Sequence, residues 1–333
     1  KKDGATYVVA IAHLGIDESS EPWRSTDLIA NTTGIDAVLD GHSHSTIAME
    51  LVKNKDGKEI PLSSTGTKLV NIGKLTISDG VFTTELVSDY AAKDDTTDVF
   101  VKSIQEKNEA LVNTVVARTS VDLTTKHSDG TRAIRNRETN LGDLCADAYR
   151  AVSGADIALV NGGGIRATIE AGDITKKDVN TVLPFGNTLS IIKITGTELL
   201  EVLEASTFCT PEAIGGFPQV SGIEFTVDTT KGYDQGDEYP GTTYFTPKSI
   251  NRVTIKTVGG KDFDPAATYT IATNDFMASG GDTYYRFVNA TANYDLGIPM
   301  DEVVMDYITT VLNGTVAADK YGEPAGRIHM LVS

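Results

Sequence analysis

Ala155-Asp-Ile-Ala-Leu-Val160 runs directly into Asn161-Gly-Gly-Gly-Ile-Arg166. The first stretch predicts a β-strand, since aliphatic residues dominate it and glycines end it. Three glycines after a strand allow the backbone to come close to a ligand. Arg166 adds a guanidinium, which can donate two parallel hydrogen bonds to a phosphate. A tight strand-to-loop turn without a ligand fits the same residues, so both interpretations stay open.

Three histidines follow two short apolar segments near the start of the chain. Residues 7–12 and 35–39 each predict a buried strand, and residues 25–31 predict a helix between them. His13 follows the first strand, while His42 and His44 follow the second. Ligand sites lie at the carboxyl ends of such strands, and neutral imidazoles bind divalent transition metals. The arrangement favours a metal site over histidines that only cap loops.

The rest of the chain alternates strands and helices. A hairpin is expected at 69–77 and 81–87. A charged amphipathic helix over 98–113 is interpreted as a linker, with a domain boundary near residue 117. Further on, the patterns predict helices at 137–152, 196–205 and 302–312, strands at 189–194, 222–227, 252–257 and 269–273, and an exposed loop at 229–243.

Composition limits the classes of function. The 333 residues are 40% hydrophobic and 23% charged, as in globular proteins, and carry a formal net charge of −17. Such a charge repels nucleic acid polymers at long range and aids solubility. No apolar run reaches the length of about 18 residues that predicts a transmembrane helix. Cys145 and Cys209 are too few for a disulfide framework or a cysteine-based zinc site, and one bridge or two free thiols both fit.

Basic and aromatic residues provide further candidates. Arg132, Arg135 and Arg137 form a basic cluster in an acidic chain, which favours an anionic ligand, although a solvated helix start also fits. Phe185 and Phe276 lie in glycine-flanked loops. Two such rings can stack on both faces of a base, at about 1–3 kcal/mol per face, although either alone fits core packing.

Taken together, the motifs resemble the 5′-nucleotidase family. Ala-His13-Leu-Gly and Gly-His42-Ser-His44 are similar to the last two motifs of its metallophosphatase domain. The resemblance to its C-terminal domain rests on four segments in the family's order: Asn140-Leu-Gly-Asp-Leu-Cys-Ala-Asp-Ala148, Asn161-Gly-Gly-Gly-Ile-Arg166, Pro184-Phe185-Gly186 and Gly280-Gly281-Asp282. It covers essentially the whole chain.

This resemblance implies an α/β chain, α+β overall, in three parts. Residues 1–92 would be the C-terminal half of a metallophosphatase domain, a partial sandwich. Residues 93–117 would be a linker helix, and residues 118–333 a complete, mixed α/β substrate-binding domain.

The resemblance also implies roles for single residues. His13 and His42 match ligands of one ion in a two-metal site, and His44 matches a ligand of the other; Zn or Mn would be expected in the intact parent. The metals would bind a water that attacks phosphorus in line. The implied substrate contacts are phosphate and ribose-side arginines, a base sandwich and a ribose acceptor, contributed by Arg135, Asn161, Gly163, Arg166, Phe185, Phe276 and Asp282.

The chain departs from the family upstream of His13. The Asp-x-His and Gly-Asn-His-Glu motifs are absent there, so no catalytic residue is retained and metal binding is expected to be incomplete. Strands 7–12 and 35–39 would lack part of their sandwich. We therefore expect a non-covalent N-terminal half or a domain-swapped dimer as the partner.

Two classes of function remain. The first is a nucleotide phosphohydrolase acting on nucleoside monophosphates, with 2′,3′-cyclic nucleotides, 3′-nucleotides or UDP-sugars as alternative substrates. The second is a nucleotide-binding fragment without catalysis. By the same resemblance, an extracellular, cell-wall or periplasmic location is expected.

Overall fold

Strand β8 (Ile157–Asn161) is the predicted strand that leads into the three glycines. The computed structural model describes residues 1–332, with the backbone alone described at Ala110. In it, β8 belongs to a five-stranded sheet. The order is β11 (Pro218–Ser221), β8, β17 (Thr268–Asn274), β10 (Thr188–Thr195) and β18 (Ala292–Pro299). β8 and β17 are parallel and the other neighbours are antiparallel, so the sheet is mixed. With helices on both of its faces, the mixed α/β class predicted for this part of the chain is confirmed.

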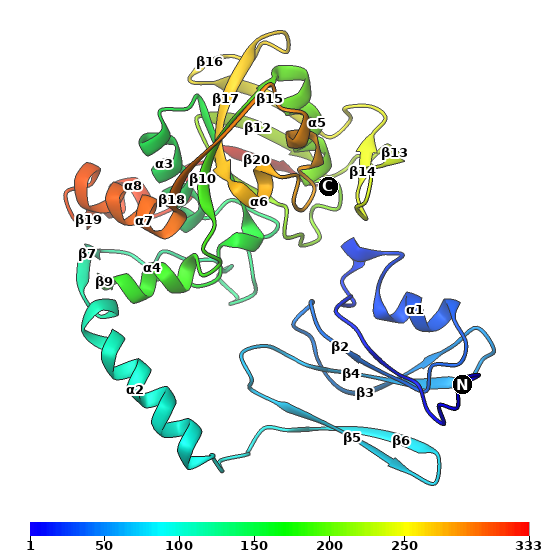
Figure 1. The fold of residues 1–333 in the computed structure, drawn as a ribbon. Helices are drawn as coiled ribbons and strands as arrows, with labels where there is room; N and C mark the ends of the chain where they lie inside the picture. Colours follow the sequence, from blue (N-terminus) through cyan, green and yellow to red (C-terminus); the bar gives the residue numbers. More distant parts are fainter. Residues whose placement is uncertain (333) are drawn as a thin grey trace. The chain divides into compact units, whose positions relative to one another are not determined.

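The two faces of β8 enter two different hydrophobic cores. Ala158 and Val160 pack with α3 (Asn140–Ser153) and α7 (Met300–Asp306), whereas Ile157 and Leu159 pack with α5 (Gly196–Ser206). Successive side chains of a strand point to opposite faces, so a fully apolar strand is expected between two such layers. Figure 1 shows α3 and α7 on one side of the sheet and α5 on the other.

Three smaller sheets complete this part of the chain. The second core includes a four-stranded sheet of β16 (Lys261–Asp262), β15 (Val253–Val258), β12 (Ile223–Asp228) and β20 (Ile328–Leu331). The other elements are β19 (Thr315–Val316), β7 (Val115–Thr119) and β9 (Gly172–Thr175) in one sheet, β13 (Gln235–Glu238) and β14 (Phe245–Pro247) in another, the helices α4 (Lys176–Val182), α6 (Asp275–Ala278) and α8 (Ala318–Tyr321), and short 3-10 turns at Gly162–Gly164 and Tyr285–Asn289.

Helix α3 has clear signals at both ends. The Thr139 hydroxyl accepts a hydrogen bond from the Gly142 N–H, and Gly154 ends the helix in the left-handed conformation. Leu141, Leu144, Cys145 and Ala148, whose spacing in the sequence places them on one face of the helix, are all buried. The predicted start at residue 137 is wrong by three residues, because Thr139 caps the helix and leaves the three clustered arginines before it.

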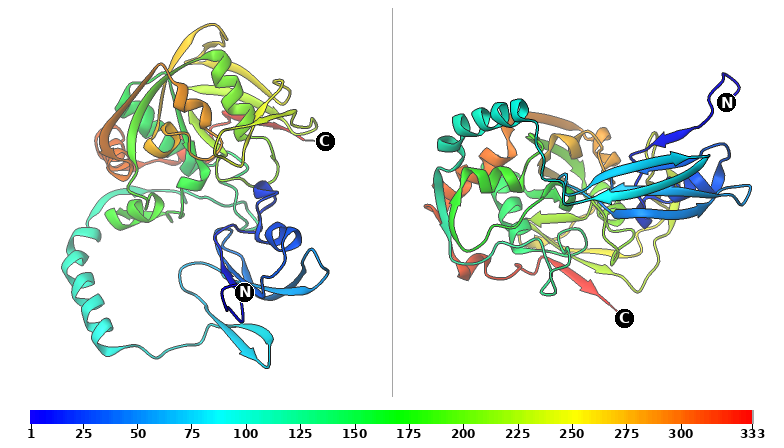
Figure 2. Two further views of the ribbon diagram at one scale, coloured as in Figure 1. Left: turned by 45° about the vertical axis from the view of Figure 1, so that its right-hand side comes forward. Right: turned by 90° about the horizontal axis from the view of Figure 1, so that it is seen from below.

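The N-terminal part forms its own sheet and core. Its order is β1 (Val9–Ile11), β2 (Ala37–Asp40), β4 (Glu59–Thr65) and β3 (Thr46–Lys53), with β1, β2 and β4 parallel. Helix α1 (Ser25–Asn31) packs on β3 and β4, and the hairpin of β5 (Ile72–Ser78) and β6 (Val81–Val87) also contacts β3 and β4 (Figures 1 and 2). A 3-10 turn spans Glu18–Ser20. β1 is an edge strand, and Ile11 in it is 88% exposed.

The chain forms two compact units, Lys1–Phe100 and the residues from Val101 onward, and the boundary between them falls within helix α2 (Asp95–Val112). Ile104 and Leu111, the apolar pair of this predicted linker, are both exposed. The domain limits predicted at 1–92, 93–117 and 118–333 stay predictions, and Ser333 lies outside the described residues.

Other boundaries differ from the sequence predictions. The predicted strand from residue 69 begins only at Ile72, because Lys68 and Leu69 adopt positive φ. The predicted helix 302–312 changes at Tyr307 into a π-helical turn, Tyr307–Val311. The predicted exposed loop 229–243 contains β13 and the buried Tyr239, whose hydroxyl donates to Glu201 at 2.9 Å.

Two questions left open by composition are answered for the described residues. Cys145 and Cys209 are free thiols, and Cys145 is buried inside α3. Within residues 1–332, none of the helices has the length and apolar character needed to cross a membrane.

Candidate functional site

The glycine turn after β8 is held by backbone neighbours. The N–H of Gly162 donates to the carbonyl of Phe217 at 2.8 Å, and that of Gly163 donates to Gly215 at 2.7 Å. A Cβ on Gly162 would lie 2.0 Å from the Ile134 carbonyl oxygen, and one on Gly163 would lie 3.0 Å from that of Gly215. At these two positions the close approach that requires glycine is therefore to the chain's own backbone. The role of Gly163 in binding a substrate stays a prediction.

Asn161, at the end of β8, joins two segments from far along the chain. Its Nδ2 donates to Oδ2 of Asp282 at 2.8 Å, and its Oδ1 accepts from Nδ2 of Asn274 at 3.0 Å. Asn274 also caps α6, because its side chain accepts from the Met277 N–H. Asn161 and Asp282, which were predicted separately as site residues, are thus brought together by direct contact.

Phe276 lies in α6 with its ring against the backbone of Gly281. A Cβ on Gly281 would be 2.4–2.6 Å from three atoms of that ring. The Gly281 N–H donates to the Phe276 carbonyl at 2.9 Å, which holds the two residues together. The ring is still 44% exposed, so it is ordered on one side and open on the other.

Phe185, which is 61% exposed, lies beside Arg166. The guanidinium carbon of Arg166 is 5.5 Å from the centre of the Phe185 ring, within the range of a cation–π contact. Nη1 of Arg166 donates to the carbonyl of Gly163 at 3.1 Å. The glycine turn, the arginine and the ring therefore form one continuous surface.

The segment that carries Phe185 is tied to helix α6, which carries Phe276 where the sequence predicts a loop. Nδ2 of Asn187 donates to Oδ1 of Asp275 at 2.8 Å, and the backbone N–H of Thr188 donates to the same oxygen at 3.2 Å. Asp275 directly precedes Phe276, and Asn187 follows Phe185 by two residues. A small pocket beside them is lined by Tyr149, Val160, Gly164, Leu183, Phe185, Asn187, Asn274 and Met300.

Three arginines share one electrostatic environment at this surface. Burial, then the charges of Arg135 and Arg166, lower the pKa of Arg132 to about 10. Burial and the charge of Arg135 also lower the pKa of Arg166. Nε of Arg135 is buried without a hydrogen-bond partner among the described residues. Because like charges held together are stabilised by a counter-ion, this cluster is suited to an anion.

Arg132 is the residue that sequence reasoning left out of the candidate site. The sequence places Arg132 in a basic cluster with Arg135 and Arg137. Only the fold shows that the charge of Arg166, as well as that of Arg135, lowers the pKa of Arg132. Arg137, the third member of the cluster, supplies its backbone carbonyl to Nε2 of Gln219 at 2.7 Å.

The three histidines lie in the N-terminal unit, after β1 and β2 as predicted. The rings of His13 and His42 are 5.2 Å apart between centres and nearly perpendicular, at 74°. Gly41 allows this, since a Cβ there would be 3.0 Å from Nδ1 of His13. His42 and His44 both adopt positive φ, at 73° and 57°.

This arrangement fits only part of a metal site. Two neighbouring imidazoles can serve as nitrogen ligands for one ion. Within residues 1–332, however, no group of three or more histidine, cysteine, aspartate or glutamate side chains is spaced to hold a metal. The roles predicted for His13, His42 and His44 as metal ligands stay predictions.

The fold and the site define a mixed α/β domain whose strand end presents an asparagine, a glycine turn, arginines and exposed aromatic rings. The family model described as "5'-nucleotidase, C-terminal domain" matches residues 115–289, just over half of the chain. The chain belongs to that family, which confirms the resemblance drawn from the motifs.

Individual proteins show the same relationship. The chain is 31% identical to the trifunctional nucleotide phosphoesterase protein YfkN of Bacillus subtilis, with 94% of this chain and 21% of YfkN covered. It is 30% identical to a 5'-nucleotidase of Vibrio parahaemolyticus, with 98% and 61% covered. The crystal structure of a 5'-nucleotidase precursor from Thermus thermophilus matches all of this chain and 65% of its own, with a TM-score of 0.75 and 27% identity. The chain therefore spans less than two thirds of each.

Proposed function

We propose that this chain supplies the nucleotide-binding part of a nucleotide phosphohydrolase of the 5′-nucleotidase type. The observation that carries the proposal is the continuous surface of Arg166, the Phe185 ring and the Gly163 carbonyl, beside the Asn161–Asp282 hydrogen bond. A nucleoside monophosphate has a dianionic phosphate, a ribose diol and a flat base. Cations, a carboxylate and aromatic rings are the groups that recognise these three parts.

Each part of the nucleotide has a proposed partner. The phosphate binds the cluster of Arg132, Arg135 and Arg166, where an anion relieves the mutual repulsion of buried cations. The ribose hydroxyls donate to Asp282. The base stacks on Phe276 and Phe185. Both side chains are exposed, and within the described residues the two rings make no contact with each other.

Binding without hydrolysis is the second candidate for the residues described. It is favoured by the histidine geometry, because His13 and His42 alone do not complete a metal site. Phosphate release from nucleoside monophosphates, 3′-nucleotides, cyclic nucleotides or nucleotide sugars needs further ligands. We propose that hydrolysis belongs to the whole protein and that this chain determines which nucleotide binds.

Calorimetric titration of the chain with adenosine and with AMP tests the binding surface. Phe276→Ala should weaken both ligands several-fold or more, since a stacked face contributes about 1–3 kcal/mol. Arg166→Gln should weaken AMP much more than adenosine, because only AMP carries the phosphate. Tyr90→Ala, at an exposed aromatic residue outside the site, is the control. Unchanged affinities in the first two variants would refute the placement of base and phosphate.

Phosphate release is measured on the same samples with added Mn²⁺ or Zn²⁺. Turnover by the chain alone would support the phosphohydrolase and refute the binding-only candidate. Tight AMP binding without turnover would support the second candidate for this chain.

A further inference from the structure

A second polar cleft lies at the opposite end of β8 from Asn161. Its lining includes Gly154 and Ala155, which precede β8, and Gly222, which follows the antiparallel partner β11. The cleft has a volume of about 610 Å³ and is open to solvent. This cleft lies at the start of β8 and the candidate nucleotide site lies at its end, so the two sites are distinct.

We propose that this cleft binds the phosphate or carboxylate group of a small molecule between Arg150 and Lys320. Both cations line it. Neither makes an ion pair with a carboxylate in the described part of the chain, although acidic residues outnumber basic ones by 46 to 29. Two cations that face one cleft without a carboxylate partner form the charge pattern that recognises an oxyanion.

The ammonium group of Lys320 is held at the cleft by tyrosines. Its Nζ donates to the hydroxyl of Tyr307 at 2.7 Å. It also lies 5.4 Å from the ring centre of Tyr307 and 5.1 Å from that of Tyr321. These contacts use one of the three N–H donors of the ammonium and restrict its motion. Binding an anion therefore costs less side-chain entropy than it would with a mobile surface lysine.

Arg150 is fixed in a comparable way, from the last turn of α3. Its Nε donates to the carbonyl of Asp156 at 3.0 Å. The side chain crosses Gly222 so closely that a Cβ there would be 2.5 Å from Nε. Its two terminal nitrogens make no hydrogen bond with the described residues, so the outer edge of the guanidinium is available to a bidentate ligand.

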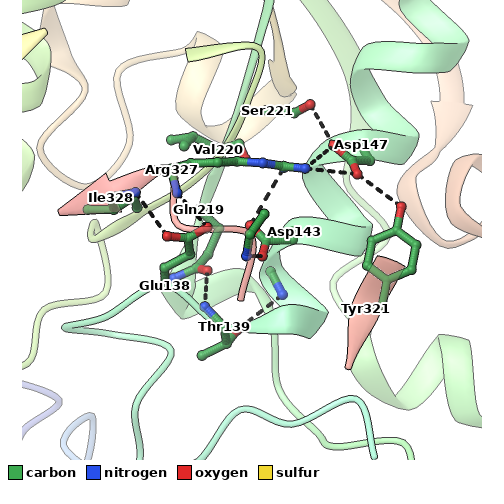
Figure 3. Close-up of polar contacts among 12 residues, drawn as sticks. Glu138, Thr139, Asp143, Asp147, Gln219, Val220, Ser221, Tyr321, Arg327 and Ile328 are labelled. Atoms are coloured by element: carbon green, nitrogen blue, oxygen red, sulfur yellow. Dashed lines mark hydrogen bonds and ion pairs between the residues drawn. The ribbon is translucent and has the colours of Figure 1, made fainter. Parts of the chain in front are cut away.

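The carboxylate in the lining, Asp147, is already paired. Nη2 of Arg327 lies 2.9 Å from its Oδ1, the Ser221 hydroxyl donates to Oδ1 at 2.6 Å, and the Tyr321 hydroxyl donates to Oδ2 at 2.9 Å (Figure 3). Arg327 also donates to the Val220 carbonyl at 2.7 Å. Because Asp147 and Arg327 neutralise each other, the net charge that faces the cleft is that of Arg150 and Lys320.

Two further features bear on the site. The C-terminal end of α3 faces the cleft through Gly154, and its partial negative charge weakly opposes an anion. A charge-assisted hydrogen bond is stronger than the effect of a helix end, so two cations outweigh it. The lining also includes Tyr307 and Val311 from the π-helical turn, a rare conformation that is frequent at functional sites.

Nuclear magnetic resonance of the ¹⁵N-labelled full chain tests this site directly. Inorganic phosphate and acetate are titrated separately at constant ionic strength, and the amide signals of Gly154 and Gly222 are followed. We expect saturable shifts in the wild type with at least one anion. Phosphate alone would indicate a phosphorylated ligand, acetate alone a carboxylate ligand, and both the shared chemistry.

Matched variants locate the response. Lys320→Gln and Arg150→Gln should each weaken the anion roughly tenfold. Lys231→Gln, at an exposed lysine paired with Asp228, should leave it unchanged. Arg166→Gln should remove phosphate from the nucleotide site but keep the shifts at Gly154 and Gly222. The proposal is overturned by the absence of saturable shifts, by unchanged affinity in both cleft variants, or by loss of the shifts in Arg166→Gln.

Discussion

The side-chain amide of Asn161 donates a 2.8 Å hydrogen bond to the carboxylate of Asp282, joining two residues that are 121 positions apart in the chain. The other end of that amide is held by Asn274, so its orientation is set from both sides. Asp282 has a φ of 51°, a left-handed conformation that aspartate tolerates better than most residues. The carboxylate is therefore ordered before any ligand arrives, which lowers the entropic cost of binding.

Replacing this carboxylate by an amide tests its role as a ribose acceptor. In Asp282→Asn the side-chain oxygen can still accept from Asn161, and asparagine tolerates positive φ, so the fold should be kept. Adenosine affinity should fall about tenfold, because a neutral acceptor replaces a charged one. Calorimetric titration measures the loss. Asp79→Asn, at an aspartate with the same φ in the β5–β6 turn, is the control. Equal affinities for adenosine in all three proteins would show that Asp282 does not contact the ligand.

Gly281 offers a way to move Phe276 without removing it. A methyl group in Gly281→Ala would meet the Phe276 ring at 2.4 Å, so the ring must shift. The backbone of Gly281 does not have positive φ, and alanine adds no strain there. Adenosine affinity should fall several-fold while the melting temperature changes little, as measured by titration and calorimetry. Gly232→Ala, where a Cβ meets nothing within 4 Å, should leave both unchanged. Wild-type affinity in Gly281→Ala would place the base elsewhere.

The sequence predicted the strands and helices better than the contacts between them. Apolar periodicity and the glycines that follow located β8, and the buried face of α3 was readable from its spacing. Asn161 and Asp282 were each named through the family resemblance, but the contact between them was not predicted, because no local pattern pairs residues so distant. The crossing of Phe276 over Gly281 was not predicted, since it depends on the turn geometry after α6.

Two differences from the sequence predictions have local physical reasons. The segment 229–243 is mostly exposed, as its glycines and aspartates predict, but it contains β13 and the buried Tyr239, which donates a hydrogen bond to Glu201 and stacks on Tyr285 at 5.2 Å. The helix from residue 302 was expected to continue regularly to 312. Periodicity alone does not distinguish an α-helical turn from the π-helical one at Tyr307.

The buried guanidinium of Arg252 should matter greatly for stability. It donates to the carbonyls of Thr207, Phe208 and Thr210, and nearby Glu204 accepts backbone N–H groups at the start of β15. Arg252→Met leaves these carbonyls unpaired and the buried carboxylate without a nearby positive charge. We expect a loss of about 3–5 kcal/mol in the free energy of unfolding, measured with urea.

The matched control for that variant is Lys256→Met, in strand β15, which directly follows Arg252. Lys256 is exposed and pairs with Glu224 at 2.8 Å, so its loss should change stability by less than about 1 kcal/mol. Equal effects of the two substitutions would mean that the Arg252 contacts do not stabilise the fold.

Asp143 should make stability depend on pH. It lies buried in α3, where Ala325 donates its N–H to Oδ2 at 2.8 Å and Arg327 approaches Oδ1 at 3.6 Å (Figure 3). Burial and the neighbouring Glu138 carboxylate outweigh the Arg327 charge and raise the pKa of Asp143 to about 8. The folded state thus binds this proton more tightly than the unfolded state, whose aspartate pKa is about 3.9.

Because the pKa of Asp143 is higher in the folded than in the unfolded state, stability falls as the pH rises. The stabilisation by the Asp143 proton is fully present below about pH 3.9 and is lost as the pH rises through about 8. Asp143→Asn keeps the acceptor for Ala325 and removes the titration. Urea unfolding between pH 5 and pH 8 should therefore show the variant gaining stability relative to the wild type as the pH rises. Asp56→Asn, at an exposed aspartate, should show no such trend. A pH-independent difference between Asp143→Asn and the wild type would mean that Asp143 is already ionised in the folded protein throughout this range.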